Sequence, residues 1–227
     1  LFVAGSIGPS NYVVSSTEAN LNKGTFGQIV ENFYHQVLGL IEGGADVLLI
    51  ETQQDILETK AIIVGANKAF DEKKKKLPMI VQATVDVFSK MQIFNTDIHA
   101  AYTAVSKMGI DVFGINCNVG PDEMIATVEK LSRFCKHPIS VVPNAGQPIS
   151  EDGQTCYKLS PEDMANTMEP FVREHGVSIV GGCCGTTPAH IKALREKLNG
   201  VVPAPRQPDK KVYVSGPQEA VPIDTSK

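Results

Sequence analysis

The chain has 227 residues, of which 42% are hydrophobic and 20% are charged, and its 25 acidic and 21 basic residues give a formal net charge of −4. This length fits one large α/β domain, which can bury a sizeable core without disulfides or metal. The mildly acidic balance argues against a nucleic acid or an anionic membrane surface as a partner, and no apolar run reaches the roughly 20 residues that span a bilayer.

Six short apolar runs predict β-strands. They are apolar nearly throughout rather than alternating, which is typical of parallel strands covered on both faces. In chain order the predicted strands span residues 2–5, 47–50, 79–84, 112–116, 139–142 and 178–180.

A segment with helical periodicity follows each run. The predicted helices span residues 25–42, 55–70, 97–108, 121–134, 160–175 and 188–198. Pro121 lies in the first turn of the fourth helix, Ser160 and Pro161 form the N-cap and first residue of the fifth, and Thr187 is the N-cap of the sixth. Gly200 lies just past the end of the last helix.

Repeated β-then-α units predict a parallel α/β fold, for which two arrangements compete. One is a doubly wound open sheet, but no G-x-G-x-x-G motif follows the first strand, which weakens its dinucleotide-binding version. The other is a (β/α)8 barrel, which needs more strands than the six that are predicted. Residues 201–211 are rich in proline and charge without periodicity, and they predict an extended linker, a disordered terminus or a connector to a further module.

Polar or reactive residues follow the predicted strands. They are Ser6, Glu51, Thr52, Asp55, Thr84, Asp86, Asn116, Cys117, Asn118, Asn144, Cys183, Cys184 and Thr186. The C-terminal ends of parallel strands lie on one face of an α/β fold, where active sites are built. We therefore expect these residues to converge on one pocket.

Three of the five cysteines, namely Cys117, Cys183 and Cys184, lie at such strand ends. An odd number of irregularly spaced cysteines is a poor disulfide framework, and no signal peptide is visible, so a reducing, cytoplasmic compartment is expected. Three thiolates without an obvious fourth cysteine or histidine favour a zinc ion with an open, catalytic position. The alternatives are buried cysteines that only pack, or a disulfide between Cys183 and Cys184; Cys135 and Cys156 are interpreted as structural or surface residues.

Glu51 follows four apolar residues, where a carboxylate needs a partner. A substrate ammonium group would satisfy it, and the alternative is an ion pair with a lysine or arginine. Asn144 is either a turn residue or a group that binds the substrate or the metal. Thr52 and Asn116 lie at the same strand ends and are included with these two as candidate substrate-binding residues. The five histidines are expected to be packing or surface residues.

These residues lie in strings that resemble the zinc-dependent homocysteine S-methyltransferase domain. Gly181–Ile191 resembles the family's signature, and Gly114–Cys117 resembles its other zinc-ligand strand. Residues 3–9, 50–52 and 143–146 also resemble family segments, in family order, so that the resemblance covers about residues 1–200. The loop Asp86–Asn95 differs from the family because it lacks a glycine.

The resemblance implies a (β/α)8 TIM barrel that lacks its first two βα units, so that the predicted strands would be strands three to eight. Residues 201–227 would then form a linker, because residues 214–220 are similar to the lead-in to the methyltetrahydrofolate-binding module of cobalamin-dependent methionine synthases.

The resemblance also implies the chemistry. Homocysteine would enter the open position on zinc as a thiolate, Glu51 would hold its ammonium group, and Asn144 would hold the fourth position until the substrate displaces it. Methylcobalamin on another module would supply the methyl group to give methionine. Betaine, S-methylmethionine or S-adenosylmethionine as donor remain alternatives, as does a non-catalytic zinc-binding module. A Schiff-base aldolase barrel is disfavoured because no predicted strand ends in a lysine.

Overall fold

The computed structural model describes residues 1–16 and 24–223 of the chain. Its centre is a six-stranded sheet in the order β1-β2-β3-β6-β7-β10, in which all neighbouring strands are parallel. The strands are β1 (Ala4–Ile7), β2 (Val47–Gln53), β3 (Met79–Ala83), β6 (Val112–Asn116), β7 (Ile139–Val142) and β10 (Val177–Val180). The predicted parallel α/β fold and all six predicted strands are confirmed, although β1 lies two residues further along the chain than expected, so that Ser6 is inside it, and β2 runs three residues further.

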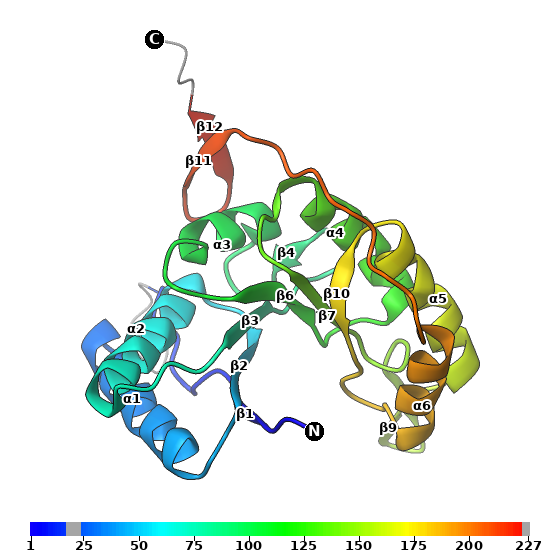
Figure 1. Cartoon of the computed structure of the whole chain (residues 1–227), viewed down its shortest axis with the longest axis horizontal. Helices are drawn as coiled ribbons and strands as arrows, with labels where there is room; N and C mark the ends of the chain where they lie inside the picture. Colours follow the sequence, from blue (N-terminus) through cyan, green and yellow to red (C-terminus); the bar gives the residue numbers. More distant parts are fainter. Residues whose placement is uncertain (17–23, 224–227) are drawn as a thin grey trace.

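The six expected helices surround the outside of the curved sheet (Figure 1). They are α1 (Phe26–Glu42), α2 (Ile56–Lys73), α3 (Ile98–Val105), α4 (Pro121–Phe134), α5 (Pro161–Arg173) and α6 (Pro188–Lys197). Helix α5 begins as predicted, because the Ser160 side chain accepts a hydrogen bond from the Asp163 backbone. Thr187 and His190 form a capping box at the start of α6. No helix in the described ranges is long and apolar enough to cross a membrane.

The sheet is open. Within residues 1–16 and 24–223, β1 pairs only with β2 and β10 pairs only with β7, so the two edge strands do not meet. The described residues therefore do not form a closed barrel; the family resemblance implies a (β/α)8 barrel without its first two βα units. Strand number, tilt and stagger are linked in a closed barrel, and at this size closure takes eight strands.

One hydrophobic core lies between the sheet and its helices. Large side chains from both layers, such as Ile50, Ile62, Phe113, Leu131 and Phe171, are 0–1% exposed. Burying a side chain of this kind contributes about 1.5–3 kcal/mol relative to its exposed state. The core therefore holds the short strands in register and fixes where each of them ends.

Two hairpins that the sequence did not predict extend from the C-terminal ends of the strands. One consists of β4 (Lys90–Met91) and β5 (Thr96–Asp97), and the other of β8 (Ile149–Glu151) and β9 (Gln154–Cys156). The second turns at Asp152 and Gly153, which have φ values of 49° and 77°. An Asp-Gly pair is a strong hairpin signal, so this element could have been found in the sequence.

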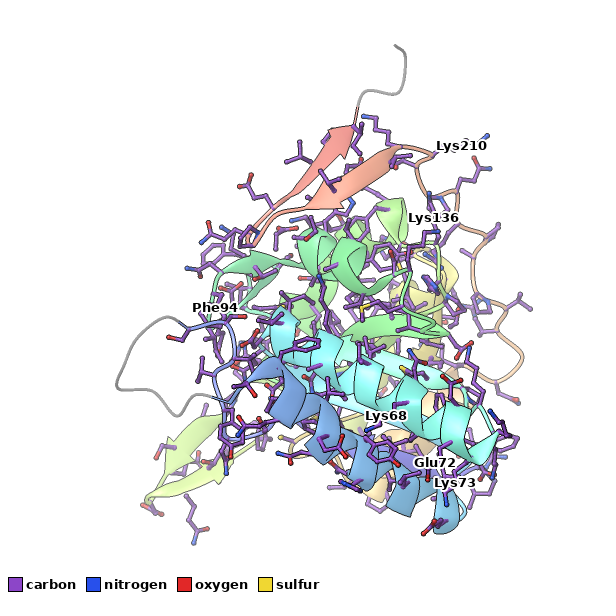
Figure 2. The ribbon with its side chains drawn as sticks, turned by 90° about the vertical axis from the view of Figure 1, so that its left-hand side faces the viewer. Lys68, Glu72, Lys73, Phe94, Lys136 and Lys210 are labelled. Atoms are coloured by element: carbon purple, nitrogen blue, oxygen red, sulfur yellow. The ribbon has the colours of Figure 1, made fainter. Side chains whose placement is uncertain are left out.

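The tail after α6 is described through residue 223 and is extended over residues 201–211; residues 224–227 lie outside the described part. It passes α5 and α4 and ends in a hairpin of β11 (Val212–Ser215) and β12 (Ala220–Ile223) beside α3 (Figures 1 and 2). The Arg206 guanidinium donates hydrogen bonds to the carbonyl oxygens of Cys135 and His137 at 2.5 and 2.6 Å. Such contacts to distant backbone groups leave no periodic pattern in the tail itself.

Candidate metal centre

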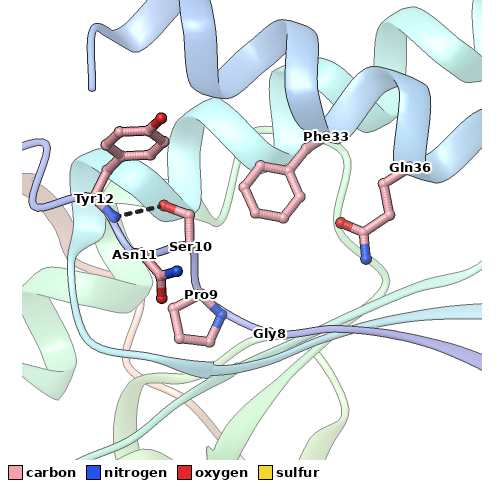
Figure 3. A pocket seen from close by; sticks show the side chains of 7 residues that line it. All are labelled: Gly8, Pro9, Ser10, Asn11, Tyr12, Phe33 and Gln36. Atoms are coloured by element: carbon pink, nitrogen blue, oxygen red, sulfur yellow. Dashed lines mark hydrogen bonds between the residues drawn. The ribbon is translucent and has the colours of Figure 1, made fainter. Parts of the chain in front are cut away.

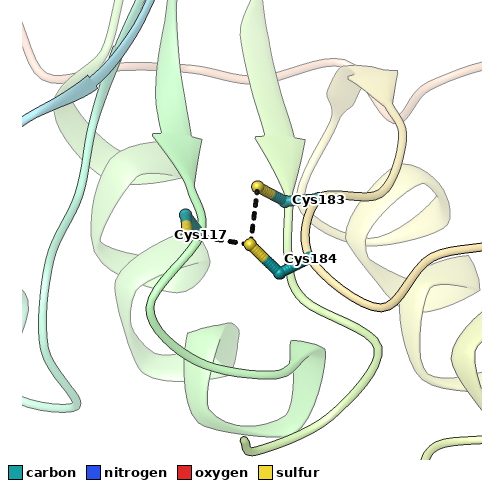
Figure 4. A group of neighbouring side chains, drawn as sticks. All are labelled: Cys117, Cys183 and Cys184. Carbon is teal, nitrogen blue, oxygen red and sulfur yellow. Dashed lines mark hydrogen bonds between the residues drawn. The ribbon is translucent and has the colours of Figure 1, made fainter. Parts of the chain in front are cut away.

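The structure brings three thiols together at the C-terminal ends of β6 and β10 (Figure 4). The Sγ atom of Cys184 lies 3.7 Å from that of Cys117 and 3.8 Å from that of Cys183. All three sulfurs lie within 4.8 Å of one another. Two thiolates on one tetrahedral zinc ion, at Zn–S distances of about 2.3 Å, are themselves about 3.8 Å apart. The spacing therefore fits a shared ion.

Unusual backbone conformations aim Cys117 toward its partners. Cys117 and the following Asn118 have φ values of 61° and 68°, a region that residues other than glycine rarely adopt. The chain therefore reverses directly after β6, and the Cys117 backbone N–H donates to the Val142 carbonyl oxygen at 3.0 Å. Strain of this kind persists only where the surrounding structure enforces it, and it is concentrated at functional sites.

The turn that carries Cys183 and Cys184 depends on glycines. A Cβ atom on Gly182 would lie 2.3 Å from the Thr186 side chain, and Gly185 has a φ of 75°. The Cys183 backbone N–H donates to the Pro143 carbonyl oxygen at 2.7 Å, which ties the turn to the end of β7. Both adjacent thiols consequently face the same point.

The donor set fits a divalent cation. Burial and the nearby thiols of Cys117 and Cys184 raise the pKa of Cys183 to about 12, and burial also raises the pKa of Cys117. No cationic side chain is among the groups that shift these two pKa values. Cys117 and Cys183 therefore resist ionisation by themselves, and a bound metal ion would supply the missing positive charge. Thiolate ligands suit zinc. All five cysteines are free, so the disulfide alternative is not formed.

Asn144 connects the two halves of this cluster. Its side chain is 2% exposed, and its Oδ1 accepts a hydrogen bond from the backbone N–H of Cys184 at 3.2 Å. Its own backbone N–H donates to the Val119 carbonyl oxygen at 3.0 Å, just after Cys117. Asn144 thus holds backbone on both sides of the cluster, and its contact with metal or substrate remains a prediction.

Glu51, Thr52 and Asn116 form a second polar group. Asn116 is fully buried; its Oδ1 accepts from the Thr52 backbone at 2.8 Å, and its Nδ2 donates to Thr52 Oγ1 at 2.9 Å and to Glu51 Oε2 at 3.4 Å. Ser6 Oγ donates to Glu51 Oε1 at 2.5 Å. No lysine or arginine of the described residues pairs with Glu51, so the ion-pair alternative is not observed there. Because Asn116 precedes Cys117, this group adjoins the thiols.

Two neighbours of the site were missed as functional candidates from the sequence. One is Ser6, whose contact with Glu51 arises because β1 and β2 pair in register. The other is Tyr157. Its ring packs against Gly185, and burial together with the nearby Cys184 thiol raises the pKa of its phenol. No local pattern marks such a residue.

A separate hollow of about 470 Å³ lies between the loop after β1 and helix α1 (Figure 3). Its lining residues are Gly8, Pro9, Ser10, Asn11, Tyr12, Phe33 and Gln36. None of them belongs to the thiol cluster or to the group around Glu51. No histidine of the described residues belongs to the cluster.

Comparisons with known proteins identify the family of this chain. Residues 1–198 match the sequence profile of the family described as homocysteine S-methyltransferase. The chain is 36% identical over 222 residues to methionine synthase of Mycobacterium tuberculosis, covering 98% of this chain and 18% of that protein. It is 35% identical over 206 residues to methionine synthase of Mycobacterium leprae, covering 89% of this chain and 17% of the relative. The chain thus spans less than a fifth of the length of these curated relatives.

Solved structures show the same fold. The apo form of the homocysteine methyltransferase MmuM from Escherichia coli superposes with a TM-score of 0.61 and 25% identity, covering 87% of this chain and 63% of that one. The metallated form of MmuM also gives a TM-score of 0.61, at 24% identity, over 87% and 61% of the two chains.

Proposed function

The chain belongs to the homocysteine S-methyltransferase family, and on this basis we propose that it forms the homocysteine-binding part of a methionine synthase. Cys117, Cys183 and Cys184 would hold one zinc ion and leave a position open for the substrate sulfur. The single observation that carries this proposal is the spacing of the three sulfurs, 3.7 and 3.8 Å along two of their edges.

We also propose that the six βα units are units three to eight of a (β/α)8 barrel. The observations that support this are the two unpaired sheet edges, at β1 and β10, and the similarity to a chain of which the present one covers 63%. Two further units between these edges would close the barrel around the site. Residues 201–227 would lead toward a methyltetrahydrofolate-binding module.

The chemistry of the site follows from what its residues can do. When bound, zinc would favour the thiolate form of homocysteine at neutral pH, which is the form that attacks a methyl group. Glu51 would receive the substrate ammonium group, because its carboxylate is held by Ser6 and Asn116 and forms no ion pair with a described residue. Asn144 would keep Cys184 in place, because its side-chain oxygen accepts a hydrogen bond from the backbone N–H of Cys184.

The methyl donor in this proposal is methylcobalamin, carried by another module of the full-length protein. Similarity to two methionine synthases over 89–98% of the chain supports this choice over betaine, S-methylmethionine or S-adenosylmethionine. Assaying the full-length protein for methionine formation with each donor separates these possibilities.

A non-catalytic zinc module would have the same three cysteines but would not accept a further sulfur. Measuring zinc content and the X-ray absorption at the zinc edge, with and without homocysteine, distinguishes the two functions. We expect one zinc per chain and one additional sulfur ligand when homocysteine is added to the full-length protein. A sulfur count that homocysteine leaves unchanged would contradict the catalytic function.

A further inference from the structure

A hollow of about 240 Å³ lies at the other end of the sheet from the thiol cluster. Its walls come from α3, from the loop between α4 and β7, and from the tail around the start of β11. The lining residues 106–107 and 136–137 precede β6 and β7, whereas the thiols follow β6 and β10. Ligand pockets usually measure about 300–1,000 Å³, so a hollow slightly below this range fits a small molecule.

One wall of this hollow is aromatic and uncharged. The rings of His99 and Phe134 are stacked, with centroids 3.9 Å apart and planes at 13°, and Tyr213 meets His99 edge-on at 4.3 Å. Burial lowers the pKa of His99, so this imidazole is neutral at pH 7. Ser215 Oγ donates to the Ala100 carbonyl oxygen at 2.9 Å, which holds the tail hairpin against α3. The wall is therefore formed before any ligand arrives.

The hollow also carries excess positive charge. Lys107, Lys136 and Lys211 line it, are exposed, and form no ion pair with a described residue. Asp209, which also lines it, accepts from the Tyr213 hydroxyl at 2.8 Å and from the Lys211 backbone N–H at 3.1 Å. Three lysines and one aspartate give these lining residues a formal charge of +2 with neutral histidines. Unpaired charges of one sign around a concave surface attract ions of the other sign.

His137 adds a directed hydrogen-bond donor. The Lys136 backbone N–H donates to the Tyr102 hydroxyl at 2.8 Å, so the proton of that hydroxyl goes to His137 Nδ1, 3.0 Å away. Burial and the charge of Lys107 lower the pKa of His137, which keeps the imidazole neutral at pH 7. A neutral imidazole whose Nδ1 accepts carries its proton on Nε2. This N–H has no hydrogen-bond partner among the described residues and is left for a ligand.

We propose that this hollow binds a small phosphate monoester, whose apolar group lies on the aromatic wall and whose phosphate is held by Lys107, Lys136 and Lys211. A phosphate monoester carries a charge of about −1.5 to −2 at pH 7, which matches the charge of the hollow, whereas a carboxylate would neutralise only half of it. Lysine is a common phosphate ligand. Lys211 belongs to the tail and the other two lysines do not, so the bound phosphate would also fasten the tail to α3 and α4.

The test is hydrogen–deuterium exchange of the full-length protein, with phenyl phosphate as the probe and at constant ionic strength. We expect slower exchange in residues 98–107 and 209–215, and the dependence on probe concentration gives a dissociation constant. Lys107→Gln and Lys136→Gln should each raise this constant by about 10-fold, because each removes one attraction to the phosphate. Lys192→Gln is the matched control: it removes an exposed lysine on α6, outside the hollow, and should leave the constant unchanged.

Inorganic phosphate and benzoate separate the two parts of the ligand. Each should protect the same residues more weakly than phenyl phosphate, because the first lacks the apolar group and the second lacks the dianion. Benzoate that binds as tightly as phenyl phosphate would contradict the assignment to phosphate. Protection that is absent, or that survives unchanged in both Lys107→Gln and Lys136→Gln, would overturn the site. None of these outcomes bears on the proposed zinc function, because no lining residue belongs to the thiol cluster.

Discussion

The side-chain oxygen of Asn144 accepts a hydrogen bond from the backbone N–H of Cys184 at 3.2 Å, although 40 positions separate the two residues in the chain. This bond joins the end of β7 to the turn after β10. Asn144 is 2% exposed, whereas Cys184 is exposed. The relationship makes Asn144 a structural support of the thiol cluster, whatever else it contacts.

Asn144→Ala should therefore lower both stability and zinc affinity. The net contribution of one hydrogen bond is about 0.5–1.5 kcal/mol, which is the expected loss in the free energy of unfolding. Urea denaturation and chelator competition measure the two effects. Asn144→Asp keeps an acceptor oxygen and should retain more of the zinc affinity; equal affinity in both variants would show that the bond to Cys184 is unimportant.

Cys183→Ala should abolish zinc binding and methyl transfer in the full-length protein. The substitution removes one of the three sulfurs that the spacing assigns to a shared ion. Metal content by elemental analysis is the direct measurement, and Cys156→Ser is the control because Cys156 lies in β9, outside the cluster. Full zinc occupancy in Cys183→Ala would refute the ligand assignment.

Glu51→Gln should mainly weaken homocysteine binding. The amide keeps the size of the side chain but loses the charge that would attract the substrate ammonium group, so KM should rise by about 10-fold or more while kcat changes less. Steady-state kinetics gives both constants. Glu151→Gln, in the β8–β9 hairpin, is a control for loss of one negative charge. An unchanged KM would argue that Glu51 has only a structural role.

Glu58 gives the folded chain a pH dependence that does not involve the metal. It is 2% exposed, and burial raises the pKa of its carboxyl group although the Ser10 backbone N–H donates to it at 2.8 Å. Because the pKa is raised in the folded state, the stability that Glu58 contributes is fully present at pH values below the pKa it has in the unfolded chain. That contribution is lost as the pH rises through the folded value.

Glu58→Gln cannot ionise, so it should gain stability relative to the unaltered protein as the pH rises from about 4 to about 7. Urea denaturation at several pH values measures this difference in the free energy of unfolding. Glu162→Gln, on the exposed first turn of α5, should show no such trend. If the stability of Glu58→Gln relative to the unaltered protein instead falls as the pH rises, the burial argument is contradicted.

Much of the fold could be predicted because its signals are local. Continuous apolar runs such as Val47–Ile50 encode buried parallel strands, and caps such as Ser160 mark where helices begin. The meeting of Cys117 with Cys183 and Cys184 also follows from the sequence, because parallel strands end on one face. That the three sulfurs are close enough to share one ion could not be predicted in this way. It depends on the positive φ at Cys117 and on the glycine turn around Cys184.

The sequence by itself determined the strands, the helix starts and which reactive residues share a face, because these depend on periodicity and capping over a few neighbouring residues. Only the tertiary structure decided that Asn144 holds Cys184, that Ser6 and Asn116 hold Glu51, that Tyr157 packs on Gly185, and that the tail lies along α4 and α5. Each of these contacts joins segments at least 28 positions apart. Such contacts depend on how the strands pair and the sheet curves, which no local pattern records.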